Sequence, residues 1–158
     1  DYTQSASMAR AMADAGADLL FEEYVTAYGP AFLDLAGSAS EGAVSWIRSL
    51  PNEEAGSNAE QDLFLEWMAQ TAPDAQPDTF AADSWVAAKA MVEALEALPG
   101  PITRDAVLAQ LRSLTSFDAG GMFGTIDLGG KRNNGCLIAM RVQGGAWTRI
   151  APGQGFLC

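Results

Sequence analysis

Apolar positions along this chain follow two different patterns. Up to about residue 115, most apolar residues recur at helical spacing, and two short apolar runs have the length of strands. Beyond residue 116, short apolar stretches are separated by glycine-rich turns, which is typical of a β-meander. The expected order is helix, strand, helix, strand, three helices and three strands, and this order predicts an α/β fold.

Five helices are predicted from apolar faces and from the residues that begin and end them. They cover residues 5–15 and 30–36, a segment from Asn58 to a break at residues 73–77, and residues 79–98 and 104–114. Asn58, Asp78 and Thr103 are the expected N-caps. Gln61 stands three residues after Asn58, the spacing of a capping box. The helix at 79–98 is apolar almost all round, so we expect it to need packing partners on several sides.

Strands are predicted at residues 18–21, 43–47, 122–128, 137–142 and 146–150. A turn at residues 129–135 joins two strands of the meander. This turn contains a Gly-Lys pair, yet a phosphate-binding P-loop requires a glycine and a Ser or Thr at fixed positions, where Thr125 and Arg132 stand. We therefore interpret the segment as a hairpin turn.

Composition narrows the function classes. The chain has 158 residues, 49% of them hydrophobic, which is enough for one globular domain with a sizeable core. Its 9 Lys and Arg stand against 20 Asp and Glu, so the formal charge is −11 and neither nucleic acid nor an anionic membrane surface is an expected partner. Histidine is absent, which excludes Ser-His-Asp and Cys-His catalysis and His-containing zinc sites.

Targeting signals and cysteines give information about the cellular compartment of the protein. No apolar run approaches the length of a membrane span, no signal peptide is present, and the first residue is Asp1. We therefore expect a mature or trimmed product, or a piece of a longer chain. The two cysteines are Cys136 and Cys158, and Cys158 ends the chain. This arrangement favours a disulfide that ties down the tail in an oxidising compartment, with a pair of reduced thiols as the alternative.

Acidic residues after the first predicted strand are candidates for ligand contacts. Glu22 and Glu23 follow the strand at 18–21, and ligands of open α/β sheets bind beyond the carboxyl ends of strands. A carboxylate there would hold an ammonium group, with Tyr24 covering the apolar part of the ligand. The alternative is a solvated acidic pair at the start of a loop.

Asp83 is a second candidate, because it lies away from the polar face of its helix. At about 100° per residue, Lys89, Glu93 and Glu96 share a narrow polar face, and Asp83 falls well off it. A carboxylate in that position needs a partner. It either benefits from the positive end of the helix or belongs to a ligand-facing cluster.

Four stretches of the sequence together carry a resemblance to a known family. They are "MARAMADAGADLLF", "AFLDLAGSASEGAVSW", "SWVAAKAMVEALEAL", and "RDAVLAQLRSL" followed by "GTIDLGGKRNNG". In order and spacing they resemble the type I periplasmic solute-binding proteins of ABC transporters, the branched-chain amino acid (leucine/isoleucine/valine) binding family. The likeness extends over nearly all of the chain. It implies that Glu41 serves a turn and hinge-side packing rather than ligand binding.

The resemblance implies a three-layer αβα lobe of a two-lobed (Venus-flytrap) α/β protein, with a C-terminal β-meander. Residues 1–75 would belong to the C-terminal ligand-binding lobe and residues 76–116 to helices crossing back to the N-terminal lobe. Residues 117–158 would form the hinge and the closing meander with its disulfide-tied tail. Because family members are considerably longer, we expect a missing N-terminal half. A second polypeptide, or another part of the same one, would complete the sheet around the parallel strands 18–21 and 43–47.

The resemblance also implies where a ligand binds. One group of family contacts lies in the loop after the first predicted strand, which here offers Glu23 and Tyr24. The other is the aromatic position at the start of the long helix, here Trp85, with Asp83 adjacent. The loop "FEEYVTAYG" lacks the family's usual early glycine, and Trp replaces the usual Tyr. These changes make the wall of the site bulkier, so another small carboxylate, an amide or an aromatic acid is an alternative to a branched-chain amino acid.

The leading hypothesis is a non-enzymatic solute-binding component of an ABC importer, periplasmic or extracellular, with a membrane-associated lipoprotein as a variant. Its partners would be a small-molecule ligand, such as an amino acid or small carboxylate, and the permease of the transporter. No cofactor and no metal are expected. A ligand-sensing receptor or regulatory ectodomain of the same fold is the alternative. An enzyme using Glu22, Glu23 and Asp83, and a structural fragment without a function of its own, are further hypotheses.

Overall fold

The computed structural model describes residues 1–17, 22–24, 26–132 and 135–158. The strand predicted at 18–21 lies outside the described residues. The elements in chain order are α1 (Tyr2–Asp14), α2 (Pro30–Ala36), the 3-10 turn η1 (Gly37–Ser40), β1 (Val44–Ile47), the 3-10 turn η2 (Asn52–Glu54), α3 (Ala59–Thr71), α4 (Thr79–Glu96), α5 (Arg104–Ser113), β2 (Ile138–Gln143) and β3 (Ala146–Ala151). The five predicted helices are confirmed.

Capping side chains set the helix starts. α1 begins earlier than predicted because Asp1 accepts hydrogen bonds from the backbone N–H groups of Thr3 and Gln4 and completes a capping box with Gln4. Asn58 caps α3 as expected, but the predicted capping box is wrong. The Gln61 side chain is fully buried and donates instead to the carbonyl oxygens of residues 50 and 51, at 3.3 and 2.5 Å. Buried carbonyls need donors, and this demand takes precedence over the local motif.

The three strands form one antiparallel sheet in the order β1-β2-β3. The expected strand at 43–47 is present as β1, and the last two predicted strands form the hairpin β2-β3. On the other edge of β1, the chain after the undescribed segment runs parallel to it. The N–H of Tyr24 donates to the carbonyl of Val44 at 2.9 Å, and the N–H of Val44 donates to the carbonyl of Glu22 at 2.8 Å.

The strand predicted at 122–128 is absent from the sheet, so this part of the predicted meander is wrong. Residues in this segment pair singly with three different neighbours, in isolated bridges Phe123–Ser49, Ile126–Phe117 and Asp127–Arg132. The physical reason is a turn in the backbone directly before the segment. Residues 119–121 have positive φ angles of 50°, 67° and 83°, whereas an extended strand has negative φ angles. The segment therefore curls into a compact loop.

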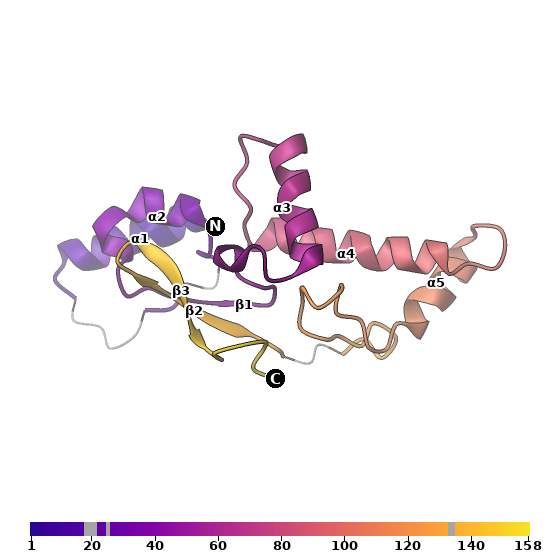
Figure 1. The fold of residues 1–158 in the computed structure, drawn as a ribbon. Helices are drawn as coiled ribbons and strands as arrows, with labels where there is room; N and C mark the ends of the chain where they lie inside the picture. Colours follow the sequence, from indigo (N-terminus) through magenta and orange to yellow (C-terminus); the bar gives the residue numbers. More distant parts are fainter. Residues whose placement is uncertain (18–21, 25, 133–134) are drawn as a thin grey trace.

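The described residues form two hydrophobic cores. The first core combines α1, α2 and the sheet through Ala6, Ala9, Ala27, Tyr28, Phe32, Ala36, Ala43, Ile47, Ile138, Met140, Val142 and Trp147. The second core combines α3, α4 and the loop at 117–123 through Phe64, Ala82, Val86, Ala90, Phe117, Ala119, Met122 and Phe123. The chain leaves the first core after β1 and returns before β2, so the two cores lie side by side in an elongated molecule (Figure 1).

Helix α4 buries only a narrow stripe of small residues. Ala82, Val86, Ala90 and Ala94 are spaced four residues apart and point into the molecule. The opposite side leaves Phe80, Met91 and Val92 from 42% to 56% exposed. This helix was predicted to need partners on several sides, and the described residues leave the side with Phe80, Met91 and Val92 exposed.

One predicted tertiary link, the disulfide, is confirmed, and a second link was not predicted. Cys136 and Cys158 form a disulfide, and the backbones of Leu137 and Leu157 exchange two hydrogen bonds of 2.9 Å beside it. The tail is therefore held against the start of β2. The carboxylate of Glu41 accepts hydrogen bonds of 3.1 and 3.2 Å from the two glycine N–H groups of the β2-β3 turn. Glu41 was predicted to serve the turn of its own segment, whereas its carboxylate binds a turn about a hundred residues away in sequence.

Candidate functional site

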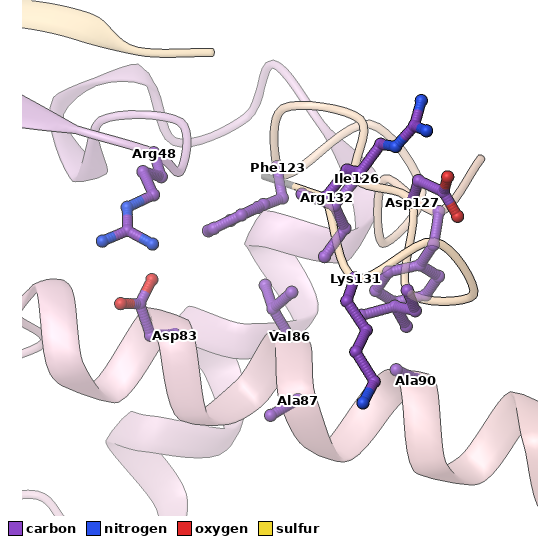
Figure 2. Close-up of a pocket in the computed structure, with 12 residues that line it drawn as sticks. Arg48, Asp83, Val86, Ala87, Ala90, Phe123, Ile126, Asp127, Lys131 and Arg132 are labelled. Carbon is purple, nitrogen blue, oxygen red and sulfur yellow. The ribbon is translucent and has the colours of Figure 1, made fainter. Parts of the chain in front are cut away.

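A cavity of about 490 Å³ lies between α4 and the loop that follows α5. Its wall is mostly apolar. α4 contributes Val86 and Ala90, and the loop contributes Phe117, Phe123 and Ile126 (Figure 2). The side chain of Phe123 lies over the cavity opposite α4. A volume of this size is within the range of small-molecule pockets.

Charged side chains surround this apolar wall. At one end, the guanidinium of Arg48 and the carboxylate of Asp83 face each other (Figure 2). At the other end, Asp127, Lys131 and Arg132 come from the turn after the loop. Asp127 is already engaged, since its carboxylate accepts the N–H of the Gly at position 130 at 2.6 Å.

Asp83 carries an unsatisfied polar atom. Its Oδ1 is buried and has no hydrogen-bond partner among the residues that the structure describes. Burial raises the pKa of the Asp83 carboxyl above its usual value, the positive charge of Arg48 opposes that shift, and Asp78 adds to it. The helix cap is Asp78, whose side chain accepts the N–H of Ala81 at 2.8 Å.

Trp85 lies on another side of α4. Its indole N–H donates to Oε1 of Glu60 at 2.9 Å, and its ring packs against Phe64 with centroids 5.8 Å apart. Nζ of Lys89 lies 2.9 Å from the other oxygen of Glu60. Trp85 thus anchors α4 to α3, and it is not among the side chains that line the cavity with Asp83.

Glu23 and Tyr24 lie beside the first core, against which Tyr24 packs. Glu23 is exposed, and Tyr24 is half-buried against Phe32 with ring centroids 5.5 Å apart. The Tyr24 hydroxyl donates to Glu22 at 3.2 Å. Burial, together with the charge of Glu22 and this hydrogen bond, raises the pKa of Tyr24 to about 12. The structure does not bring Glu22, Glu23 or Tyr24 into the cavity that Asp83 lines.

A second cavity of about 630 Å³ lies where the two cores meet, between the start of α2 and the connection from α3 to α4. Two of its polar side chains, Tyr28 and Asp78, have hydrogen-bond partners. The Tyr28 hydroxyl donates to Glu53 at 2.6 Å and accepts the N–H of Asn52 at 2.7 Å. Burial and the neighbouring Glu53 carboxylate raise the pKa of Tyr28. The side chain of Asn52 donates to the carbonyl of Pro77 at 3.0 Å. We therefore interpret this region as a structural junction.

Arg48 and Phe123 are the site residues that sequence reasoning missed. A lone Arg directly after a buried strand, in "SWIRSL", was the available signal for Arg48. Phe123 falls in the strand predicted at 122–128, and that prediction gave no indication that its side chain lines a cavity. For Lys131 and Arg132, the sequence pattern suggested only a comparison with a phosphate-binding loop.

Two further tests concern metals and membranes. Within residues 1–17, 22–24, 26–132 and 135–158, no group of three acidic or cysteine side chains is arranged to hold a metal ion. In the same ranges, no helix combines the length and apolar character that crossing a bilayer demands.

Solved structures of similar fold are binding proteins. A leucine-binding protein from Thermotoga maritima has a TM-score of 0.70 and 16% identity, with 95% of this chain and 41% of that chain covered. A fatty acid ABC transporter substrate-binding protein from Thermomonospora curvata has a TM-score of 0.74 and 18% identity, with coverages of 98% and 40%. An extracellular ligand-binding receptor from Rhodopseudomonas palustris has a TM-score of 0.67 and 20% identity, with coverages of 94% and 45%.

These comparisons agree on the fold, and the chain spans less than half the length of the structures it matches. No curated protein matches it. The family model described as "Periplasmic binding protein" matches residues 2–146, nearly the whole chain. The predicted resemblance and the type I binding-protein lobe are thereby confirmed. The chain belongs to the periplasmic binding protein family.

Proposed function

We propose that this chain is part of an extracytoplasmic solute-binding protein that delivers a small molecule to an ABC importer. The observation that carries the proposal is the cavity beside α4, where an apolar wall ends at the facing charges of Arg48 and Asp83 (Figure 2). Ligand pockets are mostly apolar, with a few polar groups that orient the ligand. Membership of a family of binding proteins supports binding rather than catalysis.

The proposed ligand is an amino acid or a similar small carboxylate or amide. Likeness to a leucine-binding protein supports an amino acid, and likeness to a fatty acid-binding component supports a carboxylate with an apolar chain. Arg48 would receive a carboxylate, and Phe123 would pack against the apolar part of the ligand. The ligand roles of Glu23, Tyr24 and Trp85 remain predictions from the family resemblance.

In this proposal the solute binds between two lobes, and this chain supplies part of the cleft. The matched structures are more than twice as long as the part covered here, which supports additional protein around the site. The exposed apolar side of α4, with Phe80, Met91 and Val92, is the kind of patch that another segment covers.

Solute binding would favour a closed arrangement of the lobes, which the permease would recognise. The ligand shifts this equilibrium only by its higher affinity for the closed state. In such a complete protein, the division into residues 1–75, 76–116 and 117–158 remains a prediction, and the site of action would be the periplasm or the cell exterior.

A receptor or regulatory ectodomain of the same fold is the second candidate. Likeness to an extracellular ligand-binding receptor favours it. Uptake of radiolabelled ligand in cells with and without the gene separates the two functions, because loss of uptake supports the importer and unchanged uptake supports the receptor.

The test of the binding function is thermal unfolding of the protein that carries this chain, against amino acids, their amides, and alkyl and aromatic carboxylates. A ligand at a hundred times its Kd stabilises the folded state by about 2.7 kcal/mol, which raises the midpoint measurably. We expect a selective rise with one ligand class. A flat response to every compound would contradict the proposal.

A further inference from the structure

We infer that the C-terminal tail is a clamp that restricts how far the two cores can move relative to each other. The tail clamp consists of Arg149 and residues 152–158, and it holds both segments in which the chain crosses between the cores. The outgoing crossing is residues 48–58, and the returning crossing is residues 124–137, of which 133–134 lie outside the described residues. This inference goes beyond the proposed binding function and does not depend on the identity of a solute.

The first argument is that the two crossings pair with each other. The N–H of Leu50 donates to the carbonyl of Met122 at 2.9 Å. Next to this bond, the N–H of Gly124 donates to the carbonyl of Arg48 at 3.2 Å. An isolated antiparallel bridge lies between the two bonds. Because the crossings are paired, a swing of one core relative to the other must bend both of them together or separate them.

The second argument is that the tail is fastened to the returning crossing. Cys158 forms a disulfide with Cys136. Beside it, the backbones of Leu157 and Leu137 exchange two hydrogen bonds of 2.9 Å, and Figure 1 shows the C-terminus next to the sheet. Cys136 also lies against the paired part of the crossings, since a Cβ added to Gly124 would be 2.5 Å from its Cβ. The covalent attachment therefore lies where the two crossings meet.

The third argument is that the same tail holds the outgoing crossing. The guanidinium of Arg149 donates to both carboxylate oxygens of Glu54, at 2.5 and 2.7 Å. It also donates to the carbonyl oxygens of Pro152 and Gly155, at 3.3 and 2.7 Å. The Arg149 side chain is only 10% exposed, so solvent and salt weaken this paired arrangement less than they would on an open surface. A single side chain thus links the tail to η2.

The disulfide keeps the tail in place for this contact. It closes a ring with a sequence separation of 22 that contains the β2-β3 hairpin, and a closed ring has fewer conformations than an open chain. Glycines at positions 153 and 155 would otherwise give the tail wide conformational freedom. A space of about 640 Å³ separates the tail from residues 54–58, so close packing does not hold the tail against η2. The position of the tail therefore depends on the ring and on Arg149.

A clamp on both crossings reduces the range of arrangements that the two cores sample. Its consequence for binding follows from entropy. When a partner or solute fixes one arrangement of the cores, a protein that already samples few arrangements loses less conformational freedom. The tail clamp would therefore make the molecule better prepared for binding between its cores.

The test removes each attachment in turn from the protein that carries this chain, with no solute added. Cys136→Ser/Cys158→Ser opens the ring, and Arg149→Gln removes the guanidinium. Amide hydrogen exchange in residues 48–58 and 122–132 should become at least about tenfold faster in both variants, because local opening of these segments becomes easier. Exchange in α1 and α4 should stay as in the parent protein.

A distance measurement tests the movement itself. Spin labels attached to keto amino acids, introduced at the exposed positions Met8 of α1 and Gln70 of α3, report the separation of the two cores without using cysteine chemistry. Double electron–electron resonance should give a broader distance distribution in both variants than in the parent protein. Faster exchange with an unchanged distribution would mean that the tail stiffens the crossings only locally, and this result would overturn the inference.

Glu41→Gln is the matched control, because it weakens a link at the opposite end of the β2-β3 hairpin. It should leave both the exchange of the crossings and the distance distribution unchanged. The same broadening in Glu41→Gln would show a general loosening of the hairpin and would also overturn the inference. Circular dichroism checks folding, and if the double cysteine variant does not fold, Arg149→Gln still tests the clamp. Since no solute is present, none of these outcomes depends on the proposed binding function.

Discussion

The single half-buried carboxylate of Asp83 affects the stability of the folded protein. Its environment is apolar on one side, and the groups that act on its charge are Arg48, which favours the ionised form, and Asp78, which disfavours it. Burial dominates, so the pKa of the carboxyl is raised. A raised pKa means that the folded protein holds this proton more tightly than the unfolded chain does, and the consequence for stability has a definite sign.

The stability that Asp83 contributes is complete below its ordinary pKa of 3.8 and is lost as pH rises through the raised folded value. Asp83→Asn removes this loss. We therefore expect the variant to be more stable than the parent at neutral pH, with a smaller fall in stability between acidic and neutral pH. Urea denaturation across that range measures both quantities. The exposed Glu96→Gln is the control, and equal pH dependence of parent and Asp83→Asn would contradict the prediction.

At the scale of elements, close backbone approach decides how the loop after α5 is held. The N–H groups of Leu128 and Gly129 donate to the carbonyl of Leu114 at 2.9 and 3.4 Å. A Cβ added to Gly129 would overlap the carbonyl oxygen of Arg112. This glycine therefore lets the loop pass against the end of α5, and the same loop forms one wall of the cavity.

Gly129→Ala should destabilise the chain by roughly 1–3 kcal/mol, because the new methyl group must displace backbone atoms rather than a flexible side chain. Gly153→Ala is the matched control, since no atom lies within 4 Å of its added Cβ. That control should change stability by less than about 0.5 kcal/mol, as for most surface substitutions. Chemical denaturation measures both. Equal effects of the two substitutions would show that the contact with α5 is not what requires glycine at this position.

At the scale of the whole molecule, polar links tie the first core to η2, the connection that leads into α3 of the second core. Arg149 of β3 binds Glu54 of η2 with two hydrogen bonds, of 2.5 and 2.7 Å, and also donates to the carbonyl of Gly155 at 2.7 Å. Tyr28 holds Asn52 and Glu53 in the same region. A paired, planar arrangement of this kind fixes orientation as well as distance.

Glu54→Gln should loosen this junction without unfolding either core. One oxygen and one negative charge are lost, and the pair is only partly exposed, so the expected cost is about 1 kcal/mol. Hydrogen exchange should become faster in residues 50–58 and stay unchanged in β2 and α4. The control is Glu96→Gln, because Glu96 makes no contact in this junction. Unchanged exchange in residues 50–58 would mean that Tyr28 alone holds the junction.

Features with local signals could be predicted from the amino-acid sequence. N-caps such as Asp78 and Thr103 predicted helix starts correctly because a cap acts on backbone groups two or three residues away. The order of four motifs identified the family, and two cysteines, one at the chain end, gave the disulfide. Asp83 stood out as a candidate because its helix position alone removes it from the polar face.

The interaction partners of these side chains could be identified only in the folded structure. The Gln61 side chain does not form the predicted capping box, because it donates to two buried backbone carbonyls nearby. The apolar run at 122–128 became a loop because residues 119–121 turn the backbone with positive φ angles and its residues pair with three different segments. The side chains of Arg48 and Asp83 face each other although they are 35 residues apart in the sequence. The chain brings them together where it runs from the first core to the second. Such partners are set by packing between distant segments, and a pattern within a few residues of sequence carries no information about them.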